Sequence, residues 1–221
     1  MNNFNPSIST TSALSINKVL RNTYMLLSLT LLFSALTAGL SMMLHVSHVV
    51  SLVCSFGALG LIWLVLPRTA HTAAGIGVVF AITGLLGFGL GPILNHYLSL
   101  SNGPELIATS LGGTGVIFLA LSGYVLTTRR DFSFMGGFLM VGIMIAVVAM
   151  LANIFLQIPA LSLALSAAII LIMSGFILFD TSRIIHGGET NYVNATVSLY
   201  LSLYNIFVSL LQLLGISGGD D

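Results

Sequence analysis

The chain has 221 residues, of which 57% are hydrophobic and only 5% are charged, and its mean hydropathy is +1.08. A water-soluble domain of this size does not carry so apolar a surface, so the composition indicates an integral membrane protein. The net charge is zero and there is no basic patch, which argues against nucleic-acid binding. The single cysteine, Cys54, excludes an intrachain disulfide and a cysteine-rich zinc site.

The first 22 residues are rich in Ser, Thr and Asn, and their only cations, Lys18 and Arg21, come directly before a long apolar segment. A cleavable signal peptide has its cations first, a shorter apolar region and a cleavage site of small residues. We therefore expect the first apolar segment to be retained. Residues 1–22 are expected to form a flexible tail, residues 23–216 a transmembrane domain, and residues 217–221 a second short tail.

Seven apolar segments follow one another with short polar connections, and each approaches the roughly 20 residues that a helix needs to cross a bilayer. The fold class predicted is therefore an all-α integral membrane bundle. The connections leave no room for a soluble catalytic domain, so any chemistry would use the helices themselves. The predicted spans are residues 24–44, 49–66, 73–94, 106–126, 134–156, 161–179 and 193–214.

The distribution of the cations indicates the orientation of these spans. With seven spans, all six cations fall on one side of the membrane, and the other side receives no Lys or Arg. The positive-inside rule assigns the cation-bearing side to the cytoplasm. We therefore expect the N-terminus inside and the C-terminus outside. The six residues are Lys18, Arg21, Arg68, Arg129, Arg130 and Arg183.

Glycines are concentrated within the third, fourth and fifth predicted spans. Small residues let helix backbones approach closely, and Gly87 and Gly91 have the GxxxG spacing of such contacts. Packing is the favoured interpretation, with local distortion of the helices as the alternative. The glycines are Gly84, Gly87, Gly89, Gly91, Gly112, Gly113, Gly115, Gly136, Gly137 and Gly142.

Polar residues recur along the last span at intervals of three or four, which places them on one side of a helix. Amides and hydroxyls need partners in the apolar core, so this stripe is expected to face inward. It is either a set of interhelical hydrogen bonds or the lining of an ion path. Its members are Asn191, Asn194, Ser198, Ser202, Asn205, Ser209 and Gln212, and the opposite side carries Leu199, Leu203, Ile206, Leu210 and Leu213.

Asp180 is a lone carboxylate at the end of an apolar run that begins at Leu161. An acid at bilayer depth costs about 2.5–3.5 kcal/mol on insertion scales, so it persists where a partner or a function compensates. Arg183 lies three residues further on and is a candidate partner on the same helix face. Asp180 is either part of an interfacial ion pair with Arg183 or a proton-sensing group that faces the polar stripe.

The familiar enzyme and metal motifs are absent from the sequence. An intramembrane aspartate protease needs a second acid at bilayer depth, and Ser174 lacks the glycine two positions earlier that a rhomboid-type serine would have. His45 and His48 are spaced for a metal but have no third ligand nearby. No Walker, HExxH or haem motif occurs. We therefore expect that the protein is not an enzyme, and that it has no cofactor and no metal site.

Several runs in the chain resemble one membrane protein family. They are FDT at residues 179–181, IHGGETNY at 185–192 and ATVSLYLSLYNIF at 195–207, with GPI at 91–93 and DFSF at 131–134. Together they resemble the signature of the Bax inhibitor-1 family, and the resemblance extends over residues 18–215. It implies a seven-helix transmembrane bundle of Bax inhibitor-1 type with the seventh helix at the centre.

The resemblance also suggests an ion-conducting function. Other bacterial members are described as pH-sensitive calcium leak channels, gated by two acids on the last two helices and an arginine from the second. The first acid matches Asp180, the second falls on Ser202, and the arginine region falls near Arg68. Two of the three elements are altered here, which argues against pH-gated calcium conduction. The ion-sensing candidates are Asp180, Arg183, Ser202, Asn205 and Arg68.

The resemblance is greater to the proteobacterial inner-membrane branch of the family. It implies that the chain modulates FtsH, the membrane-anchored ATP-dependent protease, and is also a substrate of it. The expected partners are FtsH and the regulators associated with it. The low-charge tail at residues 1–22 is the kind of segment that a processive protease engages. Our first hypothesis is thus an inner-membrane regulator with a cytoplasmic N-terminus and a periplasmic C-terminus. The second is a calcium or cation leak that uses Asp180, and the third is a structural assembly partner.

Overall fold

The computed structural model describes residues 6–217, with side chains over residues 16–216. Over this range all regular structure is helical, and seven segments are long and apolar enough to cross a membrane. The predictions of an all-α fold and of seven spans are therefore confirmed. The spans are Ile16–Met43, His48–Thr69, Ala74–Leu98, Gly103–Thr128, Ser133–Leu156, Pro159–Ile185 and Tyr192–Ile216.

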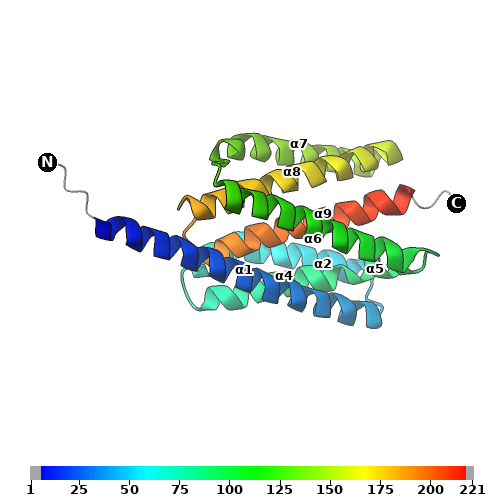
Figure 1. The fold of residues 1–221 in the computed structure, drawn as a ribbon. Helices are drawn as coiled ribbons and strands as arrows, with labels where there is room; N and C mark the ends of the chain where they lie inside the picture. The colour runs from blue at the N-terminus through cyan, green and yellow to red at the C-terminus, as the bar shows by residue number, and fades with distance from the viewer. Residues whose placement is uncertain (1–5, 218–221) are drawn as a thin grey trace.

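Figure 1 shows how the helices are arranged. Five spans each contain one long helix, and the second and third are each divided. The α-helices are α1 (Pro6–Met43), α2 (His48–Gly60), α3 (Leu66–Thr69), α4 (Ala74–Gly89), α5 (Gly91–Leu98), α6 (Gly103–Thr128), α7 (Gly136–Leu156), α8 (Pro159–Ile185) and α9 (Tyr192–Ser217). The π-helix η1 (Leu61–Val65) joins α2 to α3, and the 3-10 turn η2 (Ser133–Met135) precedes α7.

Proline and glycine account for the two divided spans. Pro67 has no N–H to donate, and its ring crowds the carbonyl one turn earlier, which falls within the widened turn η1. In the third span the helix stops at Leu90, between two glycines, and restarts with Pro92 in the first turn of α5. The distortion considered for the third span is thus present there, whereas α6 continues without a break through its own glycines.

α1 begins earlier than the sequence predicted. Its helix starts at Pro6 and runs without interruption to Met43, so the expectation of a tail without regular structure is wrong for residues 6–22. No further proline and no glycine occurs before Gly39, so nothing in this stretch stops the helix from extending backwards from the span. Figure 1 shows this end of α1 projecting beyond the other helices. Residues 1–5 and 218–221 lie outside the described part of the chain.

α9 occupies the centre of the bundle, as predicted. It packs against α8, α6, α1 and α4, whereas α7 lies at the outer edge beside α8. Both sides of α9 are covered, because Ser202 on the polar stripe and Leu199 on the opposite side are each almost fully buried. The apolar side of this helix therefore faces other helices in its central turns.

Glycines of the third span bring α4 and α5 against α1. A Cβ atom at Gly87 would lie 2.3 Å from the carbonyl oxygen of Ser34, and one at Gly91 would lie 2.1 Å from Oγ of Ser41. The packing interpretation therefore holds for this span. It fails for Gly112 and Gly115 on α6, where a Cβ atom would have no heavy atom within 4 Å beyond the helix itself.

Candidate functional site

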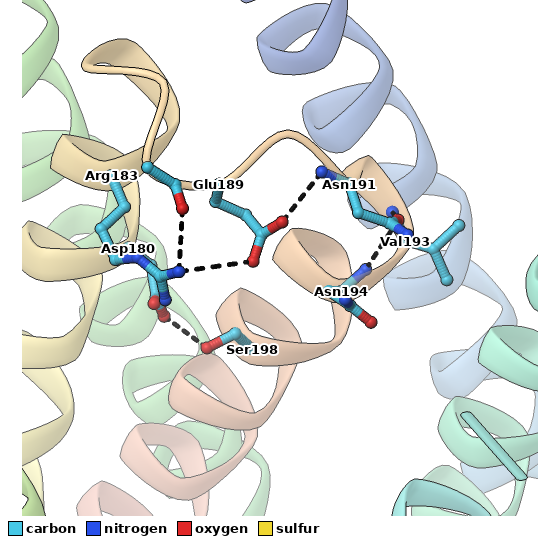
Figure 2. A network of polar contacts seen from close by, with 8 residues as sticks. Asp180, Arg183, Glu189, Asn191, Val193, Asn194 and Ser198 are labelled. Carbon is cyan, nitrogen blue, oxygen red and sulfur yellow. Dashed lines mark hydrogen bonds and ion pairs between the residues drawn. The ribbon is translucent and has the colours of Figure 1, made fainter. Parts of the chain in front are cut away.

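The carboxylate of Asp180 is buried at the contact between α8 and α9. Its side chain is 7% exposed, and Oδ2 accepts a hydrogen bond of 2.5 Å from Oγ of Ser198 (Figure 2). This separation is within the range of short hydroxyl-to-carboxylate bonds. Asp180 faces the polar stripe, as one of the two sequence interpretations expected. Its partner is Ser198, one turn before Ser202, the position that the family resemblance had indicated.

Arg183 pairs with Glu189 rather than with Asp180. Its Nη2 lies 3.8 Å from Oε2 of Glu189 and donates a 2.9 Å hydrogen bond to the carbonyl of Gly188. α8 ends at Ile185, and the connection to α9 folds back so that Glu189 lies close to Arg183 (Figure 2). The guanidinium also sits 5.5 Å above the ring of Phe179. Of the two interpretations of Asp180, the ion pair with Arg183 is therefore not the one found among the described residues.

Asn191 anchors the connection between α8 and α9. Its backbone N–H donates to Oε1 of Glu189 at 2.8 Å, and its Oδ1 accepts from the N–H of Val193 at 2.8 Å, which caps α9. Its Nδ2 donates to the carbonyl of Ala70 at 2.9 Å, in the segment after α3. The first residue of the predicted stripe is thus a helix cap that ties two connections together.

The connection after α6 is tied to the same end of the bundle. Oγ of Ser182 on α8 accepts from the N–H of Phe132 at 2.9 Å, and Nε2 of His186 lies 3.1 Å from the carbonyl oxygen of Arg129. Asp131 accepts a 2.8 Å hydrogen bond from the N–H of Ser133. Hydrogen bonds from Ser133 hold the pKa of the Asp131 carboxyl below its ordinary value.

These contacts place the connections after α3, α6 and α8 at one end of the molecule. Arg68, Arg129, Arg130 and Arg183 are therefore at one end, as the charge pattern predicted. Arg68 does not bond to Asp180, because its side chain is exposed and donates to the carbonyl of Leu64 in the preceding π-helix η1. It takes no part in the polar network around Asp180.

The remainder of the stripe forms few contacts between helices. Oγ of Ser202 donates to the carbonyl of Ser198, and Nδ2 of Asn205 donates to the carbonyl of Leu201, both within α9. Gln212 accepts from Oγ of Ser166 on α8 at 3.1 Å. Ser209 is buried and Asn194 is partly exposed. Ser198 and Gln212 thus link α9 to α8 near its two ends, as the hydrogen-bonding interpretation expected.

Sequence reasoning missed two other polar links across the bundle. The hydroxyl of Tyr24 on α1 lies 2.7 Å from Oγ of Ser122 on α6, which lies 3.2 Å from Oγ1 of Thr181 on α8. Isolated hydroxyls on distant spans form no periodic pattern, so this chain of contacts could not be predicted from the periodicity of the sequence. The proximity of Thr181 to Asp180 is the one hint it offered.

The second missed link joins α9 to α1 and α4. The Tyr200 hydroxyl lies 2.6 Å from Oγ of Ser34 and donates to the carbonyl of Thr83 at 3.3 Å. Tyr200 is almost fully buried, so these contacts satisfy a polar group inside the bundle. Across residues 16–216 no group of three or more His, Cys, Asp or Glu side chains is placed to hold a metal ion.

Comparison with known proteins identifies the family. The model of the family described as "Inhibitor of apoptosis-promoting Bax1" matches residues 16–219. "Modulator of FtsH protease YccA" of Escherichia coli K12 is 59% identical over 210 residues, which are 95% of each chain.

Two further relatives have no described function. A membrane protein of Vibrio cholerae is 47% identical over 99% of this chain and 98% of its own. A protein of Pseudomonas aeruginosa is 48% identical over 93% of this chain and 92% of its own. The seven spans and the inner-membrane location named for another Escherichia coli relative indicate a multi-pass inner-membrane protein. The chain belongs to the Bax inhibitor-1 family.

Proposed function

We propose that this protein regulates an FtsH-type membrane protease in the quality control of membrane proteins, and that it is itself a substrate of that protease. The observation that carries the proposal is the 59% identity, over 95% of both chains, to a protein named as a modulator of FtsH. The protein acts as a binding partner of the protease and not as an enzyme.

The shape of the molecule supports this role. The N-terminal end of α1 projects beyond the bundle, where a protease can bind it (Figure 1). It is helical over residues 6–22 and not the unstructured tail expected from the sequence. Lys18 and Arg21 accompany it, so the positive-inside rule places this end in the cytoplasm. A protease that pulls on α1 meets the close contact of α1 with α4 and the Tyr24 to Ser122 link. The resistance of the bundle would then hold the protease and slow its work on other substrates.

A reconstituted system tests the proposal. Proteoliposomes would contain an FtsH-type protease, ATP, a second membrane substrate, and this protein as the full chain or without residues 2–15. We expect the full chain to be degraded slowly and to slow degradation of the second substrate, and the truncated chain to lose both properties. A chain without residues 218–221 is the control and should behave like the full chain. Unchanged turnover and inhibition after removal of residues 2–15 would contradict engagement through α1. Absence of inhibition by the full chain would contradict the regulatory function itself.

A second candidate function is a pH-sensitive calcium or cation leak. The observation that favours it is the buried carboxylate of Asp180, bonded to Ser198 on the central helix. Calcium flux into proteoliposomes, measured from about pH 6 to pH 8, distinguishes this function from protease regulation. Flux that depends on pH in the native chain and loses that dependence in Asp180→Asn would support it. Calcium flux with the same pH dependence in Asp180→Asn as in the native chain would exclude Asp180 as the sensor.

A further inference from the structure

A groove of about 430 Å³ lies between α1 and α6, with α9 as its floor and with Leu90, between α4 and α5, and Leu94 of α5 also in its lining. Its walls include Ala35 and Gly39 of α1 and Leu111 and Gly115 of α6, and its floor includes Leu203 and Phe207. All of these residues belong to membrane spans. The groove is therefore at the depth of the lipid bilayer.

The groove is closed at the cation-bearing end and open to the side. At the closed end the Tyr24 hydroxyl meets Ser122, and the rings of Tyr24 and Phe118 lie 5.7 Å apart, so α1 and α6 are in contact there. Past Phe118 the walls are separated by the groove. Leu31 and Leu111 on its two rims are 37% and 56% exposed. Because these side chains face the hydrocarbon, the groove is continuous with the surface that lipid covers.

Three of the four hydroxyl groups that line the groove, those of Ser34, Thr114 and Tyr200, are already hydrogen-bonded, whereas among the described residues no hydrogen bond involves the Tyr204 hydroxyl. Ser34 and Tyr200 bond to each other at 2.6 Å, and Oγ1 of Thr114 donates to the carbonyl of Ser110 at 2.7 Å. The Tyr204 ring stacks on that of Tyr200. The other lining side chains are apolar or glycine. The lining contains no charged side chain, so an occupant is held mainly by apolar contact and a charged headgroup finds no ionic partner within the groove.

The glycines of the two walls have no packing role inside the protein. A Cβ atom at Gly39 or Gly115 would have no heavy atom within 4 Å beyond the helix itself, unlike Gly87, which meets Ser34. Glycine within a helix costs about 0.5–1 kcal/mol relative to alanine. No neighbouring helix of this chain requires these two positions to be small. The space that they leave belongs to the groove.

The size of the groove favours a lipid chain over a polypeptide helix as the occupant. A helix with its side chains is about 10 Å across, so about 430 Å³ accommodates only about one of its turns. A single hydrocarbon chain is much narrower and runs along the groove. An empty groove would forfeit the dispersion contacts of its lining. We infer that the groove between α1 and α6 binds one acyl chain of a membrane phospholipid.

Native mass spectrometry tests this inference by counting the phospholipids that remain bound after the full chain is reconstituted into phosphatidylethanolamine and phosphatidylglycerol vesicles and extracted again. The variant Gly39→Leu with Gly115→Leu fills the groove, and we expect it to retain one phospholipid fewer than the native chain. The matched control is Gly77→Leu with Gly123→Leu, since both glycines also face open space but neither lines the groove. The control should retain the native number.

Equal retention by all three proteins would overturn the inference, as would retention confined to one headgroup or a copurified polypeptide in the groove. A second measurement does not depend on folded variants. Phospholipid with a photoreactive group in its acyl chain should label lining residues such as Leu111 and Leu203 of the native chain above the level at Leu119, which is exposed on α6 outside the groove. Equal labelling of the lining and of Leu119 would contradict specific binding.

Discussion

Ser198 donates a hydrogen bond of 2.5 Å to Asp180 and thereby joins the central helix α9 to α8. The bond supplies the partner that a buried carboxylate needs, and it lies within membrane spans. It also fixes which turn of α9 faces α8 at this level. It also sets the surroundings of Asp180, the one acid that is buried among residues 16–216.

Removal of this bond should destabilise the bundle. Ser198→Ala leaves Asp180 buried without its hydroxyl partner, so we expect a loss of about 1–3 kcal/mol in the free energy of unfolding. Thermal or chemical unfolding in detergent measures the change. Ser202→Ala is the matched control, because its hydroxyl donates only to the carbonyl of Ser198 on the same helix. If Ser202→Ala lowered the free energy of unfolding as much as Ser198→Ala, the loss of stability could not be attributed to the bond with Asp180.

The contact of α4 with α1 should be sensitive to a single methyl group. In Gly87→Ala the new Cβ would lie 2.3 Å from the Ser34 carbonyl oxygen, so the helices must separate. We expect a loss of about 1–3 kcal/mol in the free energy of unfolding, as for other overpacked sites. Gly112→Ala, where the added atom meets nothing, should leave stability unchanged or raise it slightly. Equal effects of the two substitutions would contradict the close approach seen here.

Asn191 should contribute to stability through two separate bonds. Asn191→Ala removes both the cap of α9 and the bond to the Ala70 carbonyl. Asn191→Ser keeps a hydroxyl that can cap α9, but its side chain is too short to reach the Ala70 carbonyl. Loss of a cap costs about 0.5–2 kcal/mol, so the alanine variant should be the less stable by about that amount. Unfolding midpoints of the two variants and the native protein provide the comparison. Identical midpoints for the two variants would exclude a capping role.

The Asp131 turn should respond to acid. Its pKa lies below the ordinary value of 3.8, because Ser133 bonds to the charged carboxylate. The carboxylate therefore contributes stability at pH values above that ordinary value, and the contribution is lost as the pH falls through the lower pKa of the folded protein.

Melting temperatures of the native protein and Asp131→Asn, measured from neutral pH downward, test this expectation. We expect the native protein to be the more stable at neutral pH and the difference to shrink below pH 3.8 and vanish once the pH is below the lower pKa of the folded protein. A difference that stayed constant across this pH range would show that ionisation of Asp131 has no part in the turn.

The spans and the central position of α9 could be predicted from the sequence, because hydrophobic length and helical periodicity are local properties. The partners of the charged residues could not. Asp180 and Arg183 have the spacing of a helix pair, but the arginine turns to Glu189 because the connection before α9 folds back over it. Whether Ser198 or Ser202 faces Asp180 depends on how that connection sets the height of α9. Periodicity places both serines on one side and does not distinguish them.

The start of α1 shows a different limit. Ser, Thr and Asn over residues 1–22 predicted a tail because their short polar side chains favour turns and caps. The apolar span that follows provides a nucleus from which the helix extends backwards at little further cost, and in the structure it extends to Pro6. Composition reports the preference of a segment in isolation, whereas its conformation here is set by the helix that it joins.

The central place of α9 has a consequence for how the protein is made. α9 follows the six other spans in chain order, so those spans enter the membrane before the helix that they surround. Until it arrives, Asp180 lacks Ser198, and Ser34 and Thr83 lack the Tyr200 hydroxyl. The hydrogen bonds that tie α9 to α8, α1 and α4 can therefore form only after the last of the described spans has been inserted. A chain that stops before α9 lacks the helix on which α1, α6 and α8 all pack.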